Sequence, residues 1–304
     1  MEPPKTKLVF VGDVMLDRGV SQAVTTAGNG DWAFPFEKIR PMIKDADIAF
    51  GNLESIISDQ GQRMKPWFLC CSFRAAPPAL AGLQDTGFDV MSVANNHSGD
   101  FGRDAMADSA SRLLTGGISP VGYGENDTAA RKPALVSVGD TTFAYLAYND
   151  KGSSQWRAKD KRSGFSLFAS AGRSGIAWLK EETLVQDVVA AKAIADVVVV
   201  SMHTGTEYKT TPNPITERLA RLAIDSGASV VVGHHPHVKQ RVEYYSDGVI
   251  AYSLGNFVFD QNETTNPGVR DGLLLEVTFS GDELAAVVER PIRINDYSQP
   301  QKAQ

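Results

Sequence analysis

Two runs of valine constrain the fold of this chain most strongly, Val197–Val200 and Val230–Val232. Successive side chains of a strand point to opposite faces, so a strand without polar residues fits a sheet that is covered on both faces. Further short β-branched and aromatic runs alternate along the chain with stretches whose apolar residues recur at helical spacing. This alternation is the pattern of an α/β protein, which we therefore predict.

The predicted strands share a β-branched or aromatic composition and lie at Lys7–Val11, Asp47–Phe50, Asp89–Val93, Phe143–Ala147, Asp196–Ser201, Ser229–Val232, Val249–Tyr252 and Leu273–Phe279. The predicted helices share an amphipathic spacing and lie at Phe36–Lys44, Pro78–Thr86, Arg103–Thr115, Ile176–Ala195 and Pro214–Ser226. From Gln240 onward the sequence indicates consecutive strands with Asp-Gly and Asn-Pro-Gly turns. The mixture favours two packed sheets with helices outside them over one simple doubly wound sheet.

The chain of 304 residues contains no internal repeat, low-complexity tract or long linker that would divide it. We therefore expect one domain over residues 1–304, with the motif-bearing part at about 7–261 and C-terminal strands at 271–294 that complete the second sheet. Residues 151–174 are rich in Gly, Ser, Lys and Arg and are typical of a long loop. This loop either covers the site and binds an anionic polymer or is an ordinary solvated surface loop.

The charge balance excludes some classes of partner. With 30 Lys and Arg against 36 Asp and Glu, the net charge of −6 argues against nucleic acid or an anionic membrane surface as the main partner. The apolar run that starts at Leu8 stops at Gly12, and Val197–Val200 is far shorter than the ~20 residues that span a bilayer. We expect a soluble, cytoplasmic chain without an integral membrane segment; an exported protein is the alternative if a leader was removed.

Polar residues follow six of the predicted strands at the point where each strand ends. They are carboxylates, carboxamides and imidazoles, and they include Asp13, Glu54, Asn96, His203, His235, His237 and Asn256. Each alone has an ordinary structural interpretation, such as a turn at Asp13 or a core position for His203. In open α/β sheets, however, ligands bind at the carboxyl ends of the strands. The common position of these residues at one edge therefore favours a metal or polyanion site.

The candidate ligands combine oxygen and imidazole donors, and they are Asp13, Glu54, Asn96, His203, His235 and His237. This set suits a divalent transition metal such as Mn, Fe or Zn. A bridging carboxylate would place two ions ~4 Å apart, an arrangement that polarises a phosphoryl oxygen and generates a hydroxide nucleophile. We expect His235 and His237 to project the same way from an extended turn, and we assign the neighbouring His234 to the core.

Six motifs carry a family resemblance: FVGDVMLDR at 10–18, GNLE at 51–54, ANNHSGD at 94–100, MHTGTEY at 202–208, GHHPHVKQ at 233–240 and YSLGNFVFDQ at 252–261. In this order they resemble the motifs of the CapA family of bacterial capsule and poly-γ-glutamate synthesis proteins, a branch of the calcineurin-like metallophosphatases. The similarity runs from about Leu8 to Asp260. It implies a four-layer α/β/β/α sandwich with a dinuclear metal site at its top edge.

The resemblance also implies ligands for two ions. One ion would be bound by Asp13 and His237 and the other by Asn96, His203 and His235. Glu54 would stand in for the bridging aspartate of the phosphatases. The sequence departs from the phosphatase pattern at Met15, where an imidazole ligand is usual, so one or two ions remain alternatives.

The catalytic roles that the resemblance implies fall on three further residues. His97 takes the position that protonates the leaving group, and Asp100 would orient it. Arg18 is near enough in the sequence to the first motif's Asp13 to meet an anionic substrate.

Three functions follow from this site. The first is a phosphoester hydrolase associated with the synthesis of a capsule or poly-γ-glutamate-type polymer. The second keeps the metal but epimerises or cleaves a peptide or polyglutamate chain by acid/base chemistry. The third is a non-catalytic partner in a polymer-synthesis complex. Of these we expect the hydrolase, with an anionic or peptide-like substrate.

Overall fold

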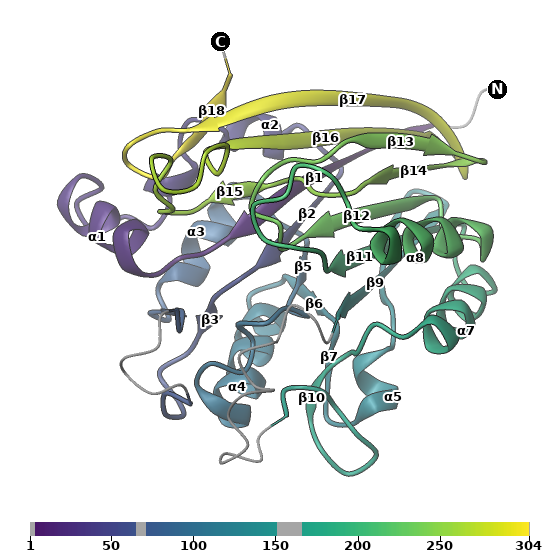
Figure 1. The fold of residues 1–304 in the computed structure, drawn as a ribbon, viewed down its shortest axis with the longest axis horizontal. Helices are drawn as coiled ribbons and strands as arrows, with labels where there is room; N and C mark the ends of the chain where they lie inside the picture. Colours follow the sequence, from purple (N-terminus) through teal and green to yellow (C-terminus); the bar gives the residue numbers. More distant parts are fainter. Residues whose placement is uncertain (1–3, 65–70, 151–165, 304) are drawn as a thin grey trace.

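The computed structural model describes residues 4–64, 71–150 and 166–303, and its strands form two large sheets (Figure 1). The first sheet has the order β18 (Pro300–Lys302), β17 (Glu283–Ile294), β16 (Asp271–Ser280), β1 (Lys5–Val14), β2 (Ile48–Leu53), β5 (Val90–Ser92) and β6 (Ser119–Val121), with β15 (Asn256–Val258) also paired to β1. The second has the order β13 (Val242–Tyr245), β14 (Gly248–Ala251), β12 (Val230–His234), β11 (Val197–His203), β9 (Thr141–Asn149) and β8 (Ala134–Val138).

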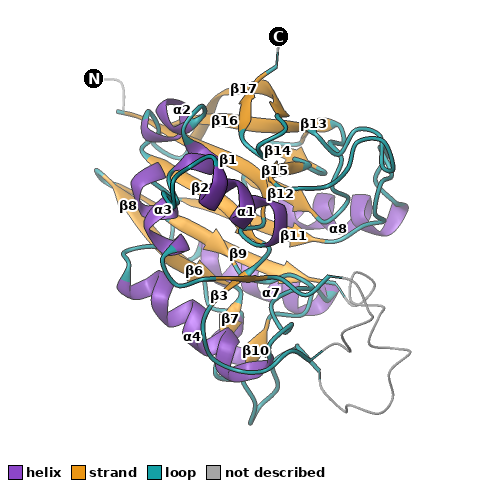
Figure 2. Cartoon of the chain, turned by 90° about the vertical axis from the view of Figure 1, so that its left-hand side faces the viewer, coloured by secondary structure: helices purple, strands orange, loops and turns teal. Residues whose placement is uncertain are grey.

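Two short strand pairs complete the strands of the described chain, β3 (Ile56–Ile57) with β4 (Arg74–Ala75) and β7 (Tyr123–Gly124) with β10 (Gly175–Ile176). The helices are α1 (Arg18–Thr26), the short 3-10 helix η1 (Phe34–Phe36), α2 (Arg40–Lys44), α3 (Ala79–Thr86), α4 (Gly102–Thr115), α5 (Asp127–Ala130), α7 (Glu181–Lys192) and α8 (Pro214–Asp225). Helices α7 and α8 lie on one side of the molecule and α1 and α3 on the other (Figure 1), and α1 and α3 lie in front of β1 and β2 in Figure 2.

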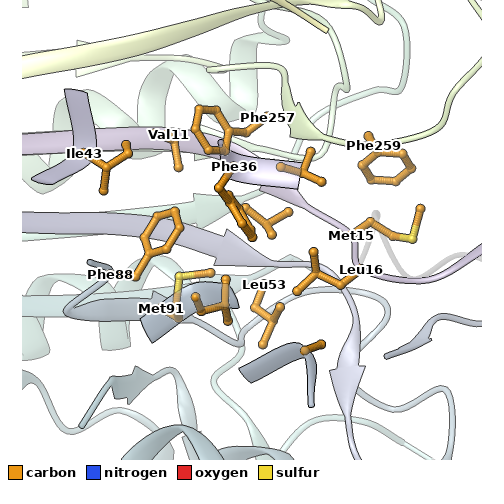
Figure 3. Close-up of a cluster of buried hydrophobic side chains, with 14 of the residues drawn as sticks. Val11, Met15, Leu16, Phe36, Ile43, Leu53, Phe88, Met91, Phe257 and Phe259 are labelled. Atoms are coloured by element: carbon orange, nitrogen blue, oxygen red, sulfur yellow. The ribbon is translucent and has the colours of Figure 1, made fainter. Parts of the chain in front are cut away.

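Alternate residues of β1 face two different cores. Val9 and Val11 belong to the apolar cluster between the first sheet and helices α1 to α4, part of which Figure 3 shows. Leu8 and Phe10 belong to the cluster between the two sheets. A period of two in a strand that is apolar throughout thus places side chains on both faces of a buried sheet, as the sequence predicted.

The valine run of β11 has the same arrangement in the second sheet. Val197 and Val199 face the cluster between the sheets, whereas Val198 and Val200 face the cluster that includes residues of α7 and α8. The layers are therefore helices, first sheet, second sheet and helices. This confirms the predicted four-layer α/β/β/α sandwich.

Every predicted strand is present, but two helix predictions differ from the structure. Of the helix predicted at Phe36–Lys44, only Arg40–Lys44 form an α-helix, α2, with Pro41 in its first turn, and Phe36 is the last residue of η1. The helix predicted from Ile176 begins only at Glu181, because Ile176 pairs with Tyr123 across β10 and β7. Of the predicted loop 151–174, residues 151–165 lie outside the described part of the chain, and the predicted role of this loop over the site lies outside it too.

The C-terminal strands belong to the first sheet and not, as predicted, to the second. β16 is antiparallel to β1, with Leu8 opposite Val277, and β17 pairs with β16. At the edge of the second sheet β14 pairs with β13, and the chain then returns to β1 through β15. Strand composition does not specify which of two stacked sheets a strand joins, so the sequence does not reveal this crossover.

Candidate metal centre

The carboxyl ends of the central strands bring the candidate ligands to one edge of both sheets. Asp13 is the penultimate residue of β1 and is in register with Asn52 of β2 and Asn256 of β15. Glu54 follows β2 directly, and His203 ends β11 opposite His234 of β12. All six of these strand-end residues are fully buried. The parallel register therefore brings the predicted candidate ligands together at this edge.

Glycine is required where the chain segments meet behind this edge. A Cβ atom on Gly12 would lie 1.9 Å from the backbone oxygen of Gly255, and one on Gly233 would lie 2.0 Å from that of Tyr252. Any side chain at either position would overlap backbone atoms. The glycines therefore allow β1 and β12 to approach the segment 252–255 closely.

Glu54 lies at the centre of the candidate site. It is fully buried, and neither carboxylate oxygen has a hydrogen-bond partner among the described residues. Its Oε1 atom is 3.8 Å from the Nε2 atoms of three imidazoles, those of His97, His203 and His237. Burial, followed by the charge of Asp13, raises the pKa of Glu54 well above its ordinary value. A buried carboxylate without donors is costly, so this environment fits a bound cation.

The spacing of these atoms is compatible with coordination. Ligand atoms that each lie about 2.1 Å from one ion are at most about 4.2 Å apart. The separation of 3.8 Å between Glu54 Oε1 and His237 Nε2 falls within that limit. The carboxamide oxygen of Asn96 and the Nε2 atom of His203, 2.9 Å apart, also fall within it. The residues present therefore fit the divalent metal that the sequence analysis predicts.

Asp13 is fixed by several contacts. Its Oδ1 atom accepts a hydrogen bond of 2.8 Å from Asn52 Nδ2 and lies 3.3 Å from His234 Nδ1. Its Oδ2 atom lies 3.4 Å from His237 Nδ1. Burial alone would raise the pKa of Asp13, but its interactions with His234 and His237 hold that pKa well below the ordinary value. Asp13 is therefore an ionised carboxylate.

The two histidines of the His-Pro-His turn adopt a backbone conformation that differs from the predicted extended turn. Their φ angles are +95° at His235 and +57° at His237, and their ring centroids are 6.0 Å apart. Non-glycine residues in this region cost of order 1–3 kcal/mol and persist where the surrounding structure enforces them. The structure around the turn therefore enforces a strained backbone at both of these histidines.

Asn256 orients the imidazole of His237. Its Nδ2 atom donates to Gln261 Oε1 and to the backbone oxygen of Val269, each at 2.9 Å. Since both amide hydrogens are used there, Oδ1 is the atom that accepts from His237 Nδ1, also at 2.9 Å. This bond leaves His237 Nε2 facing Glu54, which is the arrangement of an imidazole ligand oriented by an outer carbonyl group.

The three imidazoles differ in protonation. Burial, followed by the charge of His235, lowers the pKa of His203 well below its ordinary value. Burial and then the charge of His237 lower the pKa of His235 to about 3. Burial alone would lower the pKa of His237, but Glu54 and Asp13 raise it to about 9. His203 and His235 are thus neutral, which is the form that binds a metal. At His237 a proton competes with a metal ion for the ring nitrogen.

His97 and Asp100 form a buried pair beside these ligands. The Nδ1 atom of His97 is 2.7 Å from Asp100 Oδ2, which also accepts a hydrogen bond of 2.9 Å from the backbone N–H of Phe73. The ring of Phe73 stacks on the imidazole with centroids 4.1 Å apart. The pair predicted from the sequence is therefore present, and Phe73 is a contact that the sequence did not indicate.

A pocket of about 510 Å³ opens over the site. It is lined by Arg18, Cys71, Phe73, His97, Glu207, Tyr208, His237, Phe259, Asp260, Gln261 and Asn262. Arg18 forms an ion pair with Asp260, and its guanidinium carbon lies 4.6 Å from the centroid of the Phe73 ring. Four of the eight described non-glycine residues with positive φ line this pocket, Arg18, Cys71, Tyr208 and His237. Such clustering is typical of functional sites.

The structure brings every predicted site residue to this one region and places four further residues in contact with them or at the pocket. Asn52 and Asn256 were visible as strand-end carboxamides, yet their contacts with Asp13 and His237 were not. Glu207 at the pocket rim lies in the motif at 202–208 but was not predicted as a site residue, and Phe73 carried no signal. Met15, in contrast, is fully buried among apolar side chains with Leu16 and Phe259 (Figure 3), and its sulfur accepts a hydrogen bond from the backbone N–H of Asp17.

His234 is buried as predicted, with its ring 6.3 Å from that of Phe50, and it also contacts Asp13. Separately, none of the helices in the described part of the chain combines the length and the apolar character that a membrane span requires.

Two stacked sheets between helical layers, with ligand-type side chains at the carboxyl ends of the strands, define a fold of the metallophosphatase type. Solved structures share it: a phosphatase from Mycoplasma pneumoniae matches 96% of this chain and 94% of its own at 11% identity with a TM-score of 0.56. A putative 5'-nucleotidase from Staphylococcus aureus matches 98% of this chain and 54% of its own at 15% identity with a TM-score of 0.52. These likenesses concern the fold alone.

The chain belongs to the bacterial capsule synthesis protein PGA_cap family, whose model matches residues 7–261. The capsule biosynthesis protein CapA of Bacillus anthracis is 30% identical over 98% of this chain and 69% of its own. The PGA biosynthesis protein CapA of Bacillus subtilis is 32% identical over 94% of this chain and 71% of its own. The family and the fold class predicted from the sequence are both confirmed.

Proposed function

We propose that this protein is a metal-dependent phosphoester hydrolase that acts in the synthesis of a capsule or poly-γ-glutamate-type polymer. The observation that carries the proposal is the position of Glu54, a buried carboxylate without hydrogen-bond partners among the described residues, 3.8 Å from three imidazole nitrogens. The biosynthetic context comes from the family and from the names of the CapA relatives.

The metal ligands we propose are the predicted ones. Asp13 and His237 would hold one ion, Asn96, His203 and His235 would hold a second, and Glu54 would lie between them. Divalent ions at such a site polarise a phosphoryl oxygen and lower the pKa of a bound water. The mixture of carboxylate, carboxamide and imidazole donors suits Mn, Fe or Zn.

The remaining roles fall on His97, Asp100 and Arg18. His97 lines the pocket, and Asp100 accepts a hydrogen bond from its Nδ1 atom, so the Nε2 atom is the one that donates a proton to a leaving group. The charge of Asp100 stabilises the protonated imidazole. Arg18 lines the same pocket and contacts the anionic part of the substrate.

One observation favours a second candidate, metal-dependent epimerisation or cleavage of a peptide or polyglutamate chain. The charge of Arg18 is matched by Asp260, and the pocket walls include the aromatic rings of Phe73, Tyr208 and Phe259. A peptide-like substrate fits such walls without needing a strongly cationic pocket. In this case His97 would move a proton at the carbon next to a carbonyl group.

The deciding experiment combines elemental analysis of freshly purified protein with hydrolysis of p-nitrophenyl phosphate and its diester across added Mn²⁺, Fe²⁺ and Zn²⁺. We expect bound metal and metal-dependent turnover. Asn96→Ala and His235→Ala should lose both, whereas His97→Ala should keep the metal and lose about 10²-fold or more in rate. Full activity in His97→Ala would refute the role of His97.

Protein that binds metal but hydrolyses no phosphate ester would favour the second candidate function. Mass spectrometry of a polyglutamate peptide incubated in deuterated water then detects deuterium uptake or cleavage. Protein that contains no transition metal and hydrolyses no ester would favour a non-catalytic partner in a polymer-synthesis complex.

A further inference from the structure

The loop that follows β11 carries a carboxylate to the candidate metal centre from outside the predicted ligand set. One oxygen of Glu207 and one nitrogen each of His235 and His237 lie within 4.8 Å of one another. The two imidazoles are buried, whereas Glu207 is exposed at the rim of the pocket. Glu207 thus faces two of the proposed ligands from the solvent side.

The backbone around Glu207 is fixed to the strand end that carries those imidazoles. The N–H of Thr204 donates to the backbone oxygen of His234 at 3.1 Å, and the N–H of Tyr208 donates to that of Pro236 at 2.8 Å. The chain reverses between these bonds through positive φ angles, +120° at Gly205 and +62° at Tyr208. Glu207 therefore sits in a loop that is hydrogen-bonded on both sides to the 234–236 segment.

The centre also has room for another ligand. Met15, where the phosphatase pattern has an imidazole, is buried in the apolar core. The Nδ1 atom of His235 is buried without a hydrogen-bond partner among the described residues. A buried nitrogen without a partner beside a positioned carboxylate is expected where a centre is built to hold cations.

We propose that Glu207 is a metal ligand whose carboxylate joins Asp13 and His237 at the first ion, in place of the imidazole that position 15 does not supply. This inference rests on the metal centre of the proposed function. A carboxylate oxygen is a harder donor than an imidazole nitrogen. A site that contains Glu207 should therefore prefer Mn²⁺ over Zn²⁺ more than a site with an imidazole at that place would.

The test measures metal binding to the full-length chain, freed of metal, by isothermal titration calorimetry with Mn²⁺ and by elemental analysis after dialysis. Loss even of an outer-shell partner of a metal ligand weakens affinity by about 10–100-fold. Glu207→Gln and Glu207→Ala should therefore bind Mn²⁺ at least about tenfold more weakly or lose one equivalent. Glu182→Gln, an exposed site on α7, is the matched control and should bind as the wild type does.

The outcomes separate this inference from the proposed function. Wild-type Mn²⁺ affinity and stoichiometry in both Glu207 variants would overturn the ligand role, whatever the wild type hydrolyses. Metal-loaded wild type that cleaves no phosphoester would overturn the hydrolase while a tenfold loss in Glu207→Gln still supports the ligand. Wild type that takes up no Mn²⁺, Fe²⁺ or Zn²⁺ would overturn both. Thermal unfolding of the metal-free variants shows whether a loss of affinity reflects a loss of folding.

Discussion

The Nδ1 atom of His97 lies 2.7 Å from Asp100 Oδ2, and this buried pair stands beside Glu54, whose Oε1 atom is 3.8 Å from the other imidazole nitrogen. One nitrogen of the imidazole thus contacts a carboxylate that orients the ring, and the other nitrogen faces the proposed metal centre. Phe73 fixes the ring plane by stacking on it. These contacts keep the imidazole in one orientation, as a general acid requires.

Asp100→Asn should therefore reduce turnover while leaving the metal in place. The amide keeps the size of the side chain but removes the charge that stabilises a protonated His97. We expect kcat to fall by about 10²-fold, the lower end of what general acid catalysis contributes, with little change in KM. Steady-state kinetics with elemental analysis checks this. Asp104→Asn, an exposed site in the first turn of α4, is the control; equal kcat in both variants would contradict the role of Asp100.

Asn256→Ala should weaken metal binding without removing a ligand. The Oδ1 atom of Asn256 accepts from His237 Nδ1 at 2.9 Å and so directs Nε2 toward Glu54. Partners of this kind are worth about 10–100-fold in metal affinity. Calorimetric titration of the metal-free protein measures the change. Asn266→Ala, in the following loop, should bind as the wild type does; unchanged affinity in Asn256→Ala would mean that the His-Pro-His turn alone holds His237 in place.

Gly12→Ala should destabilise the fold and with it the site. The added Cβ would lie 1.9 Å from the backbone oxygen of Gly255, so β1 or the segment before β15 must move. We expect a loss of at least about 2 kcal/mol in the free energy of unfolding, measured by chemical denaturation. Gly172→Ala, where the new methyl group meets nothing within 4 Å, is the control. A stability equal to that of the control would show that the backbone relaxes around the methyl group.

The sequence revealed the candidate ligands because strand-end position is a local property. Asp13, Glu54 and His203 each follow an apolar run, and parallel pairing then brings such residues to one edge. The sandwich was predictable for a similar reason, because uninterrupted valine runs require cover on both faces. These inferences need only the period of a strand and the direction of parallel pairing.

Contacts between distant segments could not be predicted in this way. Asn256 and Val269 are thirteen residues apart, yet the hydrogen bond between them determines which atom of Asn256 faces His237. Glu207 reaches the site only because positive φ angles at Gly205 and Tyr208 turn the loop back toward Pro236. Backbone reversals and side-chain orientation depend on tertiary packing, which no periodicity in the sequence encodes.

The stability of the metal-free protein should fall as the pH rises from about 6.5 to about 9. The pKa of His237 is raised from 6.5 to about 9, chiefly by Glu54 and Asp13 against the effect of burial. A proton bound more tightly in the folded state stabilises it fully below the unfolded pKa, and this contribution disappears as the pH rises through the folded pKa. The shift corresponds to about 3 kcal/mol at most.

Bound metal should remove this dependence, because the ion takes the place of the proton. Denaturant unfolding across this pH range, with and without Mn²⁺, tests the prediction, and His237→Gln should have a flatter profile. Metal-free wild type whose stability stays constant or increases up to pH 9 would show that His237 is not protonated in the folded protein.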